Sequence, residues 1–257
     1  DMNDPYITYE NNYIESLWSI LKKLYDKGLL YEGYTIQPYS PAAGTGLSSH
    51  ELNQPGCYRD VKDTSLTAQF EAKNTAKSAF LFEKSGGAPV YLLAWTTTPW
   101  TLVSNTAIAV HPDVEYVAIE VTEDETSEVL VVAQNLMDAV KGEKKILKTM
   151  LGKELERVTY NRPFDYIEIP DAHFVVLATY VTTEDGTGLV HQAPAFGADD
   201  LAVCRSYGLP VVNPIAPDGH FLADVPVVGG LFFKDADKPL VKELKASGAL
   251  YKHQQYE

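Results

Sequence analysis

The sequence contains only two cysteines, no long apolar run and no excess of positive charge. Because Cys57 and Cys204 lie far apart in the chain, we expect no disulfide framework and a reducing compartment, the cytoplasm. No stretch approaches the ~18 consecutive apolar residues of a membrane span, so no membrane partner is expected. The start of the sequence has neither a basic region nor an apolar run, so no signal peptide is visible.

Basic residues are outnumbered, with 21 Lys and Arg against 35 Asp and Glu and a net charge of −14. Affinity for nucleic acids comes largely from Lys and Arg that neutralise phosphates. The acidic balance therefore opposes nonspecific nucleic-acid binding, unless other domains hold the nucleic acid or only its tip is touched. We expect the basic run 141–148 to be a solvated loop or helix end, and the acidic run 123–125 to be a hairpin tip.

The hydrophobic content of 45% and the charged content of 22% are typical of a folded globular protein. Apolar residues at helical spacing predict a helix over 12–27, capped by Asn11 or Asn12 and ended by Gly28. Two more helices are predicted over 199–207 and 237–246, each followed by glycine. A short helix is also predicted over 136–140.

Short β-prone runs separated by turn residues occupy most of the remaining chain. Strands are predicted at 29–38, 65–70, 79–83, 89–95, 106–110, 114–121, 128–133, 158–160, 173–178 and 188–191, with a loop at 40–49. Many short strands with few helices indicate an α+β protein, a β-barrel core with peripheral helices. We expect an entry helix and connecting segment over 1–62, the barrel body over 63–230, and a C-terminal helix and return segment over 231–257.

A threonine-rich segment follows one of the predicted strands. Residues 95–101 read Trp-Thr-Thr-Thr-Pro-Trp-Thr, and Asn105 comes shortly after. Pro99 lacks a backbone donor and ends the strand. Beyond a strand end, several hydroxyls and free backbone N–H groups can converge on one small ligand. An ordinary threonine-rich edge strand has the same composition, so the segment alone leaves both interpretations open.

A second segment brings a histidine and two carboxylates close together in the chain. His191 ends a predicted strand, a Pro/Gly loop follows, and Asp199 and Asp200 then open a helix. Carboxylates at a helix start are stabilised by the helix dipole and by free N–H groups, and we expect Asp199 to be such a cap. Asp200, one position deeper, is expected to face the loop that carries His191. There it could hold a cation, such as a substrate ammonium, through a charge-assisted hydrogen bond.

Other chemistries find little support in the sequence. The remaining histidines are scattered and lack the spacing of metal ligands, so no metal is expected. No Gly-x-Ser-x-Gly elbow occurs, which disfavours a Ser-His-Asp hydrolase. A nonenzymatic β-barrel module that binds a small ligand or stabilises a larger protein is the alternative. Asp200 together with the threonine run distinguishes the two, because a structural barrel needs neither.

Taken together, the two segments resemble the editing domains of isoleucyl-tRNA synthetases. Residues 95–101 with Asn105 are similar to that family's threonine-rich peptide, where valyl and leucyl relatives usually have Thr-Thr-Arg-Pro. Residues 186–194, Gly-Thr-Gly-Leu-Val-His-Gln-Ala-Pro, with Asp200 after them, are similar to its second editing motif. The likeness extends over nearly the whole chain. The parent's two ATP-binding signatures, His-Ile-Gly-His and Lys-Met-Ser-Lys-Ser, are absent, so the chain resembles the insertion that interrupts the parent's catalytic domain.

Some positions depart from the family pattern. Val103 stands where proline is frequent, and Gln192 and Phe196 give the second motif a eukaryote-like form. A Cys-x-x-Cys pair that some members carry near residues 41–43 is missing here, so no zinc is expected. None of these changes removes a residue to which the resemblance gives a role.

The resemblance implies an aminoacyl-ester hydrolase that removes valine from isoleucine tRNA, with valyl-adenylate as a further substrate. It assigns catalysis to Thr98, His191 and Asp200. It assigns substrate binding to Thr96, Thr97, Trp100, Thr101, Asn105, His191 and Asp200. No cofactor is implied. The expected partners are the 3′ end of isoleucine tRNA carrying valine and the rest of the parent synthetase, and we expect a cytoplasmic monomer.

Overall fold

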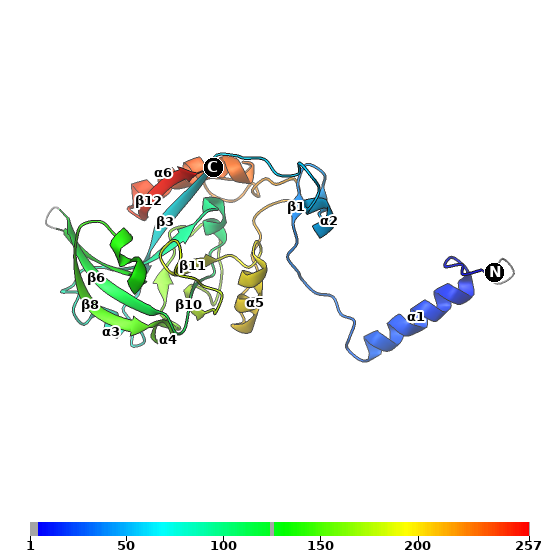
Figure 1. The fold of residues 1–257 in the computed structure, drawn as a ribbon, viewed down its shortest axis with the longest axis horizontal. Helices are drawn as coiled ribbons and strands as arrows, with labels where there is room; N and C mark the ends of the chain where they lie inside the picture. Colours follow the sequence, from blue (N-terminus) through cyan, green and yellow to red (C-terminus); the bar gives the residue numbers. More distant parts are fainter. Residues whose placement is uncertain (1–4, 124–125, 257) are drawn as a thin grey trace. The chain divides into compact units, whose positions relative to one another are not determined.

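The computed structural model describes residues 5–123 and 126–256, which form two compact units, one ending at Thr35 and one running from Ile36 (Figure 1). The first unit contains α1 (Asn11–Asp26), so the predicted amphipathic helix is confirmed. Its N-cap residue is Glu10, not Asn11 or Asn12, and no side chain caps it. None of the side chains of α1 is buried. No helix among the described residues is long and apolar enough to cross a membrane.

The second unit is built on one mixed, curled sheet of ten strands. Its strands are β3 (Asp63–Ala72), β4 (Val90–Thr96), β5 (Ala107–Val110), β6 (Glu115–Glu123), β7 (Thr126–Ala133), β8 (Glu143–Leu151), β9 (Tyr160–Asn161), β10 (Phe174–Leu177), β11 (Leu189–Gln192) and β12 (Leu250–Tyr256). A separate hairpin joins β1 (Tyr39–Ser40) to β2 (Thr45–Gly46). The predicted α+β class with a β-barrel core and peripheral helices is confirmed.

Six of the strands close into a barrel. The pairing runs from β3 to β4, β11, β5 and β10. β9 pairs with β3, and the residue before it, Thr159, bridges to Phe174 at the start of β10. Backbone hydrogen bonds from Tyr160 to His173 (3.1 Å) and from Val175 to Val158 (2.9 Å) complete the ring. Closure leaves this part of the sheet without free edges, which the short strands could not otherwise protect.

Alternation along β3 and β4 fills the barrel with apolar side chains. Leu66, Phe70 and Leu92 are fully buried in the main core, whereas their odd-numbered neighbours point to the other face. The first half of β4 pairs in parallel with β7, and only its end reaches β11. β4 therefore belongs to the barrel at the end where the threonine run begins, and to a β7–β6–β8 extension at its start.

Short helices lie around the sheet. They are α2 (Ser49–Leu52), α3 (Ala79–Phe82), η1 (Pro99–Ser104), η2 (Gln134–Ala139), α4 (Gly152–Leu155), α5 (Ala198–Ser206), η3 (Phe233–Ala236) and α6 (Asp237–Ser247). The predicted helices near α5, α6 and η2 are confirmed, and Gly208 and Gly248 follow α5 and α6 in the left-handed conformation, as predicted. In Figure 1, α6 leads directly into β12, which pairs with β3.

Several local predictions were wrong. Residues 79–82 form α3, not a strand, because a four-residue apolar run has no period that separates the two. The basic run lies largely in β8, an edge strand that pairs with β6 and buries Leu147 and Met150, while Lys145 is exposed and the Lys144 ammonium donates to the Val140 carbonyl. Residues 29–38 form no strand, and the predicted loop 40–49 contains the β1–β2 hairpin.

Residues 124 and 125 of the predicted hairpin tip lie outside the described residues, although Glu123 pairs with Thr126 on either side of them. The division of the chain at residues 62 and 230 stays a prediction.

Candidate functional site

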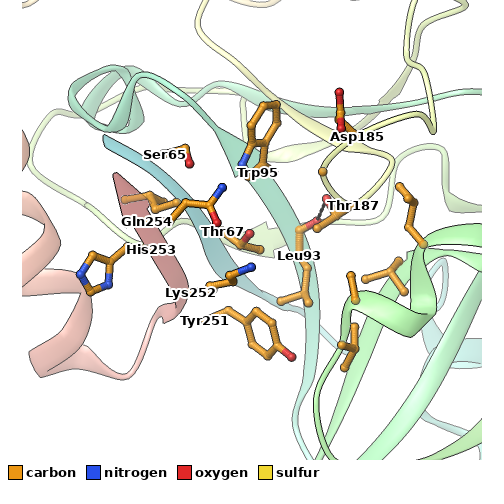
Figure 2. Close-up of a pocket in the computed structure, with 16 residues that line it drawn as sticks. Ser65, Thr67, Leu93, Trp95, Asp185, Thr187, Tyr251, Lys252, His253 and Gln254 are labelled. Atoms are coloured by element: carbon orange, nitrogen blue, oxygen red, sulfur yellow. Dashed lines mark hydrogen bonds between the residues drawn. The ribbon is translucent and has the colours of Figure 1, made fainter. Parts of the chain in front are cut away.

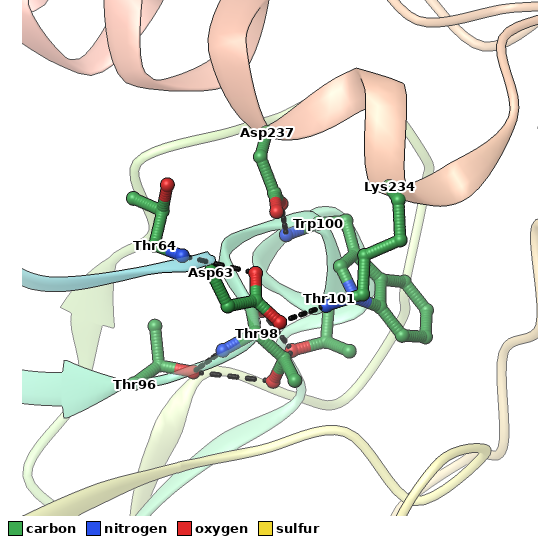
Figure 3. Close-up of polar contacts among 8 residues, drawn as sticks. All are labelled: Asp63, Thr64, Thr96, Thr98, Trp100, Thr101, Lys234 and Asp237. Carbon is green, nitrogen blue, oxygen red and sulfur yellow. Dashed lines mark hydrogen bonds and ion pairs between the residues drawn. The ribbon is translucent and has the colours of Figure 1, made fainter. Parts of the chain in front are cut away.

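The threonine run folds into a compact hydrogen-bonded turn at the end of β4. The Thr96 hydroxyl accepts the Thr98 backbone N–H at 3.1 Å and lies 3.3 Å from the Thr98 hydroxyl (Figure 3). Pro99 then starts η1, as expected of a residue that cannot continue a ladder. Within η1 the Thr101 hydroxyl donates to the Thr98 carbonyl at 2.8 Å. Thr98 and Thr101 are thereby brought together, with their hydroxyl oxygens 3.2 Å apart.

His191 joins this turn to β11, the strand that pairs with the end of β4. Its Nε2 lies 2.8 Å from the Thr101 hydroxyl, and its Nδ1 lies 3.1 Å from the Asn105 side-chain nitrogen. The imidazole is 6% exposed, and burial lowers its pKa to about 4. His191 is therefore neutral at physiological pH, with both ring nitrogens engaged by side chains of the η1 region.

The direction of these hydrogen bonds fixes the histidine tautomer. The Tyr160 hydroxyl donates to the Asn105 side-chain oxygen at 2.7 Å, and the Asn105 nitrogen donates to the Ala107 carbonyl at 2.9 Å. The same nitrogen can then only donate to Nδ1 of His191, so Nε2 carries the proton and donates to Thr101. The chain of donors runs from Tyr160 through Asn105 and His191 to Thr101, and every group in it is satisfied.

Asp200 lies at the start of α5, directly against the segment that follows His191. Its carboxylate accepts the Ala193 backbone N–H at 2.8 Å. Gly197 passes so close that a side chain there would contact the carboxylate carbon at 2.8 Å. Burial raises the pKa of Asp200 to about 6, against which the Ala193 hydrogen bond acts. The prediction that Asp200 faces the loop of His191 is confirmed. Asp199 was expected to cap the helix, but Gly197 is the N-cap residue and Asp199 is exposed in the first turn.

A second buried carboxylate lies against the η1 side of the site. Asp237, the first residue of α6, accepts the Trp100 backbone N–H at 3.1 Å (Figure 3). It is 6% exposed, and burial raises its pKa to about 6. Next to it Lys234 pairs with Asp63 at the start of β3. This cluster ties η1 to α6 and β3, elements far apart in the sequence.

Aromatic packing holds the two motifs side by side. The Trp100 ring contacts Phe196, from the loop after His191, with ring centroids 4.7 Å apart. On the α6 side Trp100 contacts Phe233 at 4.8 Å. The Trp100 indole nitrogen is buried and has no partner among the described residues. Trp100 thus forms a wall between the loop of Asp200 and the start of α6, with a polar atom left free.

The structure brings most of the predicted site residues together. One hydrogen-bonded network contains Thr96, Thr98, Thr101, Asn105 and His191. Asp200 accepts the backbone N–H of Ala193, two residues after His191. Thr97 is half-buried and makes no hydrogen bond within the part of the chain that the structure describes. No group of three His, Cys, Asp or Glu side chains among the described residues could hold a metal ion.

Sequence reasoning missed Tyr160, Phe196, Phe233 and Asp237. Tyr160 and Phe196 lie in segments that were identified, but nothing in the sequence shows that their side chains meet Asn105 and Trp100. Asp237 resembles any acidic residue at a helix start. Only the packing of α6 against η1 gives it the Trp100 backbone as a partner, 137 residues away.

Comparison with known proteins links this arrangement to aminoacyl-tRNA synthetases. Residues 1–217 match the family of tRNA synthetases class I (I, L, M and V). The chain is 51% identical to an isoleucine–tRNA ligase of Streptomyces coelicolor, over 100% of this chain and 23% of that protein. It is 46% identical to one of Bacteroides fragilis, over 98% of this chain and 24% of the relative. The chain thus spans about a quarter of the length of these relatives.

Solved structures share the fold. The crystal structure of GlLeuRS-CP1 superimposes with a TM-score of 0.60 at 21% identity, covering 74% of this chain and 99% of that one. The Plasmodium knowlesi cytosolic leucyl-tRNA synthetase editing domain has a TM-score of 0.53 at 11% identity, covering 76% of this chain and 97% of that one. At such identities the likeness establishes the fold alone.

Proposed function

The chain belongs to the class I tRNA synthetases (I, L, M and V), and from that membership we propose that it is the editing domain of an isoleucine–tRNA ligase and hydrolyses valine esterified to isoleucine tRNA. The need for such a domain is energetic. Isoleucine and valine differ by one methylene, which is worth only ~1–3 kcal/mol in a hydrophobic pocket, a limit for which isoleucyl-tRNA synthetase is itself the standard illustration. A second site that accepts valine and rejects isoleucine by size overcomes this limit.

The observation that carries the proposal is the placement of Asp200 beside the His191–Thr101 connection. In the proposed complex the Asp200 carboxylate binds the α-ammonium of valine, and the unsatisfied Trp100 indole with Thr101 and Phe196 limits the size of the side-chain pocket. A carboxylate that is ionised at neutral pH gives a charge-assisted hydrogen bond to an ammonium group. The ester is thereby held with its carbonyl toward the threonine turn.

Hydrolysis itself requires water to attack the ester carbonyl carbon and lose a proton, while the bond to the ribose oxygen breaks and that oxygen gains a proton. We assign Thr98, with Thr96 and Thr97, to positioning this water and the terminal ribose through hydroxyl and backbone groups. The vicinal ribose hydroxyl lies next to the reacting ester, where it can give its proton to the leaving oxygen and take up the proton that the attacking water releases. His191 has both nitrogens engaged and a pKa of about 4, so we assign it the role of holding Thr101 and Asn105 in place, not that of a general base.

The test is deacylation of isoleucine tRNA charged with valine or with isoleucine. Faster release of valine than of isoleucine is expected, with Thr98→Ala and Asp200→Ala as impaired variants and Asp199→Ala as the matched control. Equal release of both amino acids would contradict the size limit. Because a net charge of −14 opposes binding to the RNA backbone, a nonhydrolysable valyl-adenosine analogue provides a second measurement. If the chain neither releases valine nor binds the analogue, the proposal is refuted, and the alternative, a nonenzymatic barrel module, remains.

A further inference from the structure

A cavity of about 240 Å³ lies on the face of β3 and β4 that points away from the barrel core (Figure 2). Ser65, Thr67, Leu93 and Trp95 line it, and Leu66, whose side chain belongs to the main core, also borders it. The other walls are η2, the loop 185–187 and β12. Trp95 lies next to the threonine run, but no residue of the threonine–His191–Asp200 site itself lines this cavity. It is therefore a separate site.

One end of the cavity is rich in hydrogen-bond donors. Ser65 is 1% exposed, and its hydroxyl has no hydrogen-bond partner among the described residues. The half-buried Trp95 indole N–H also has none in that part of the chain, and a side chain added at Gly186 would lie 3.1 Å from the Trp95 ring. Figure 2 shows the side chains of Lys252 and Gln254 extending from β12 toward β4 across the cavity. An unsatisfied buried hydroxyl destabilises the folded chain, and a ligand that accepts its hydrogen bond would remove that cost.

The opposite wall is apolar. It is formed by Leu93 and Val132 from the sheet and by Leu136, Ala139 and Val140 from η2 and its end. Ligand pockets for drug-sized molecules usually measure ~300–1,000 Å³, so this cavity suits something smaller. Its modest size and its mixed polar and apolar lining fit a compact amphipathic molecule.

We propose that this cavity binds a small aliphatic carboxylic acid. The carboxylate accepts hydrogen bonds from the Ser65 hydroxyl, the Trp95 indole and the Lys252 ammonium, which are donors of the kind that bind anions. The branched or linear alkyl group lies on Val132, Leu136 and Val140. Asp185 lies at the rim, where its exposed carboxylate favours a ligand that also carries an ammonium group, so a free amino acid and a simple carboxylic acid are two sources of the same chemistry.

The experiment is a titration of the ¹⁵N-labelled chain followed through the indole N–H resonances of its three tryptophans. Trp18→Phe and Trp95→Phe assign the signals. The probes are 3-methylbutanoate, L-valine and 2-methylpropylamine. We expect 3-methylbutanoate to shift the Trp95 resonance in a saturable way and 2-methylpropylamine, which lacks the carboxylate, to leave it unchanged. If L-valine binds more tightly than 3-methylbutanoate and Asp185→Asn removes the difference, the natural source is an amino acid; equal affinities indicate a simple acid.

Matched variants test which groups bind the carboxylate. Ser65→Ala and Lys252→Met are each expected to weaken binding of 3-methylbutanoate about tenfold or more, because each removes a hydrogen bond to a charged group. Ser104→Ala is the control, since its hydroxyl is equally buried and unpartnered but does not line the cavity. Ala139→Phe, at an exposed position on the cavity wall, should block binding without disturbing the core.

The proposal is overturned if saturating 3-methylbutanoate leaves Trp95 unchanged, or if Ser65→Ala and Lys252→Met bind it as tightly as the unaltered chain. A shift confined to Trp100 would place the ligand in the site proposed for hydrolysis and would also overturn it. Because Asp200→Ala should retain the Trp95 shift while losing valyl-ester hydrolysis, the two proposals succeed or fail separately.

Discussion

The first turns of α5 and α6 contact the candidate site from opposite sides, and each contributes an aspartate that accepts a backbone N–H of the site. Asp200 of α5 accepts the Ala193 backbone N–H, and Asp237 of α6 accepts that of Trp100. Burial raises the pKa of each carboxylate to about 6. They differ in access, because Asp237 is almost fully buried whereas Asp200 is only partly buried. The same chemistry therefore leaves Asp200 able to meet a ligand and confines Asp237 to positioning the backbone.

The largest expected effect separates the two carboxylates by activity. Asp200→Ala should lower kcat/KM for valyl-tRNA hydrolysis by roughly 10²–10³-fold, because it leaves the substrate ammonium without its charged partner. Analogue binding, measured by calorimetry, should fall in parallel. Retained analogue affinity in Asp200→Ala would remove its role as the ammonium ligand and leave the two helix starts equivalent.

A smaller effect follows from lowering the pH. Because Asp200 has a pKa of about 6, its protonation below that value removes the negative charge that binds the ammonium group. The value of kcat/KM should therefore fall about tenfold as the pH is lowered from 7 to 5, because the pH dependence of kcat/KM reports ionisation of the protein without substrate. This fall should disappear in Asp200→Asn and persist in Asp237→Asn. His191 adds no limb near neutrality, because its pKa is already lowered to about 4.

Asp237→Ala should act mainly through the position of Trp100. Loss of the acceptor leaves the Trp100 N–H unsatisfied, which costs about 1–3 kcal/mol of stability in urea denaturation. Hydrolysis should slow by no more than about tenfold and size discrimination should weaken, since Trp100 shifts relative to Phe196. A drop as large as that of Asp200→Ala would show that Asp237 meets the substrate.

The stability of the chain should also reveal the ionisation of both carboxylates. Each binds a proton more tightly when folded than when unfolded (pKa about 6 against ~3.9), so stability falls as pH rises through this window. As the pH rises from 5 to 7.5, the free energy of unfolding of Asp200→Asn and of Asp237→Asn should each increase by about 1 kcal/mol relative to that of the unaltered chain. His173 and His191, with pKa values lowered to about 4, act in the opposite direction, so the variants must be compared at each pH.

The smallest effects are expected from the neighbouring aspartates. Asp199→Ala and Asp235→Ala remove exposed carboxylates beside Asp200 and Asp237. Each should change stability by less than ~0.5 kcal/mol and hydrolysis by less than about twofold. A larger change in either would mean that charge near the helix start, and not the specific contact, explains the effect of its buried neighbour.

Much of the fold followed from local patterns. Short β-prone runs bounded by turn residues predicted β3, β4, β5, β6, β7 and β10, and glycines marked the ends of α1, α5 and α6. Where the local signal was short or carried charge, it failed, as for α3 and for β8. The lysines of β8 look like a solvated loop in the sequence, and only the pairing with β6 places them in an edge strand.

The sequence by itself determined the chemistry that is available: a hydroxyl-rich strand end, a histidine at the end of a strand, and a carboxylate in the first turn of a helix. Tertiary structure alone decided which of these groups meet. The barrel brings His191 against Thr101 and Asn105, and α6 places Asp237 on the Trp100 backbone. The physical reason is that the direction of side chains repeats every two residues in a strand and about every 3.6 residues in a helix, so a local pattern can predict it. Burial, pKa and hydrogen-bond partners depend instead on contacts between residues far apart in the chain.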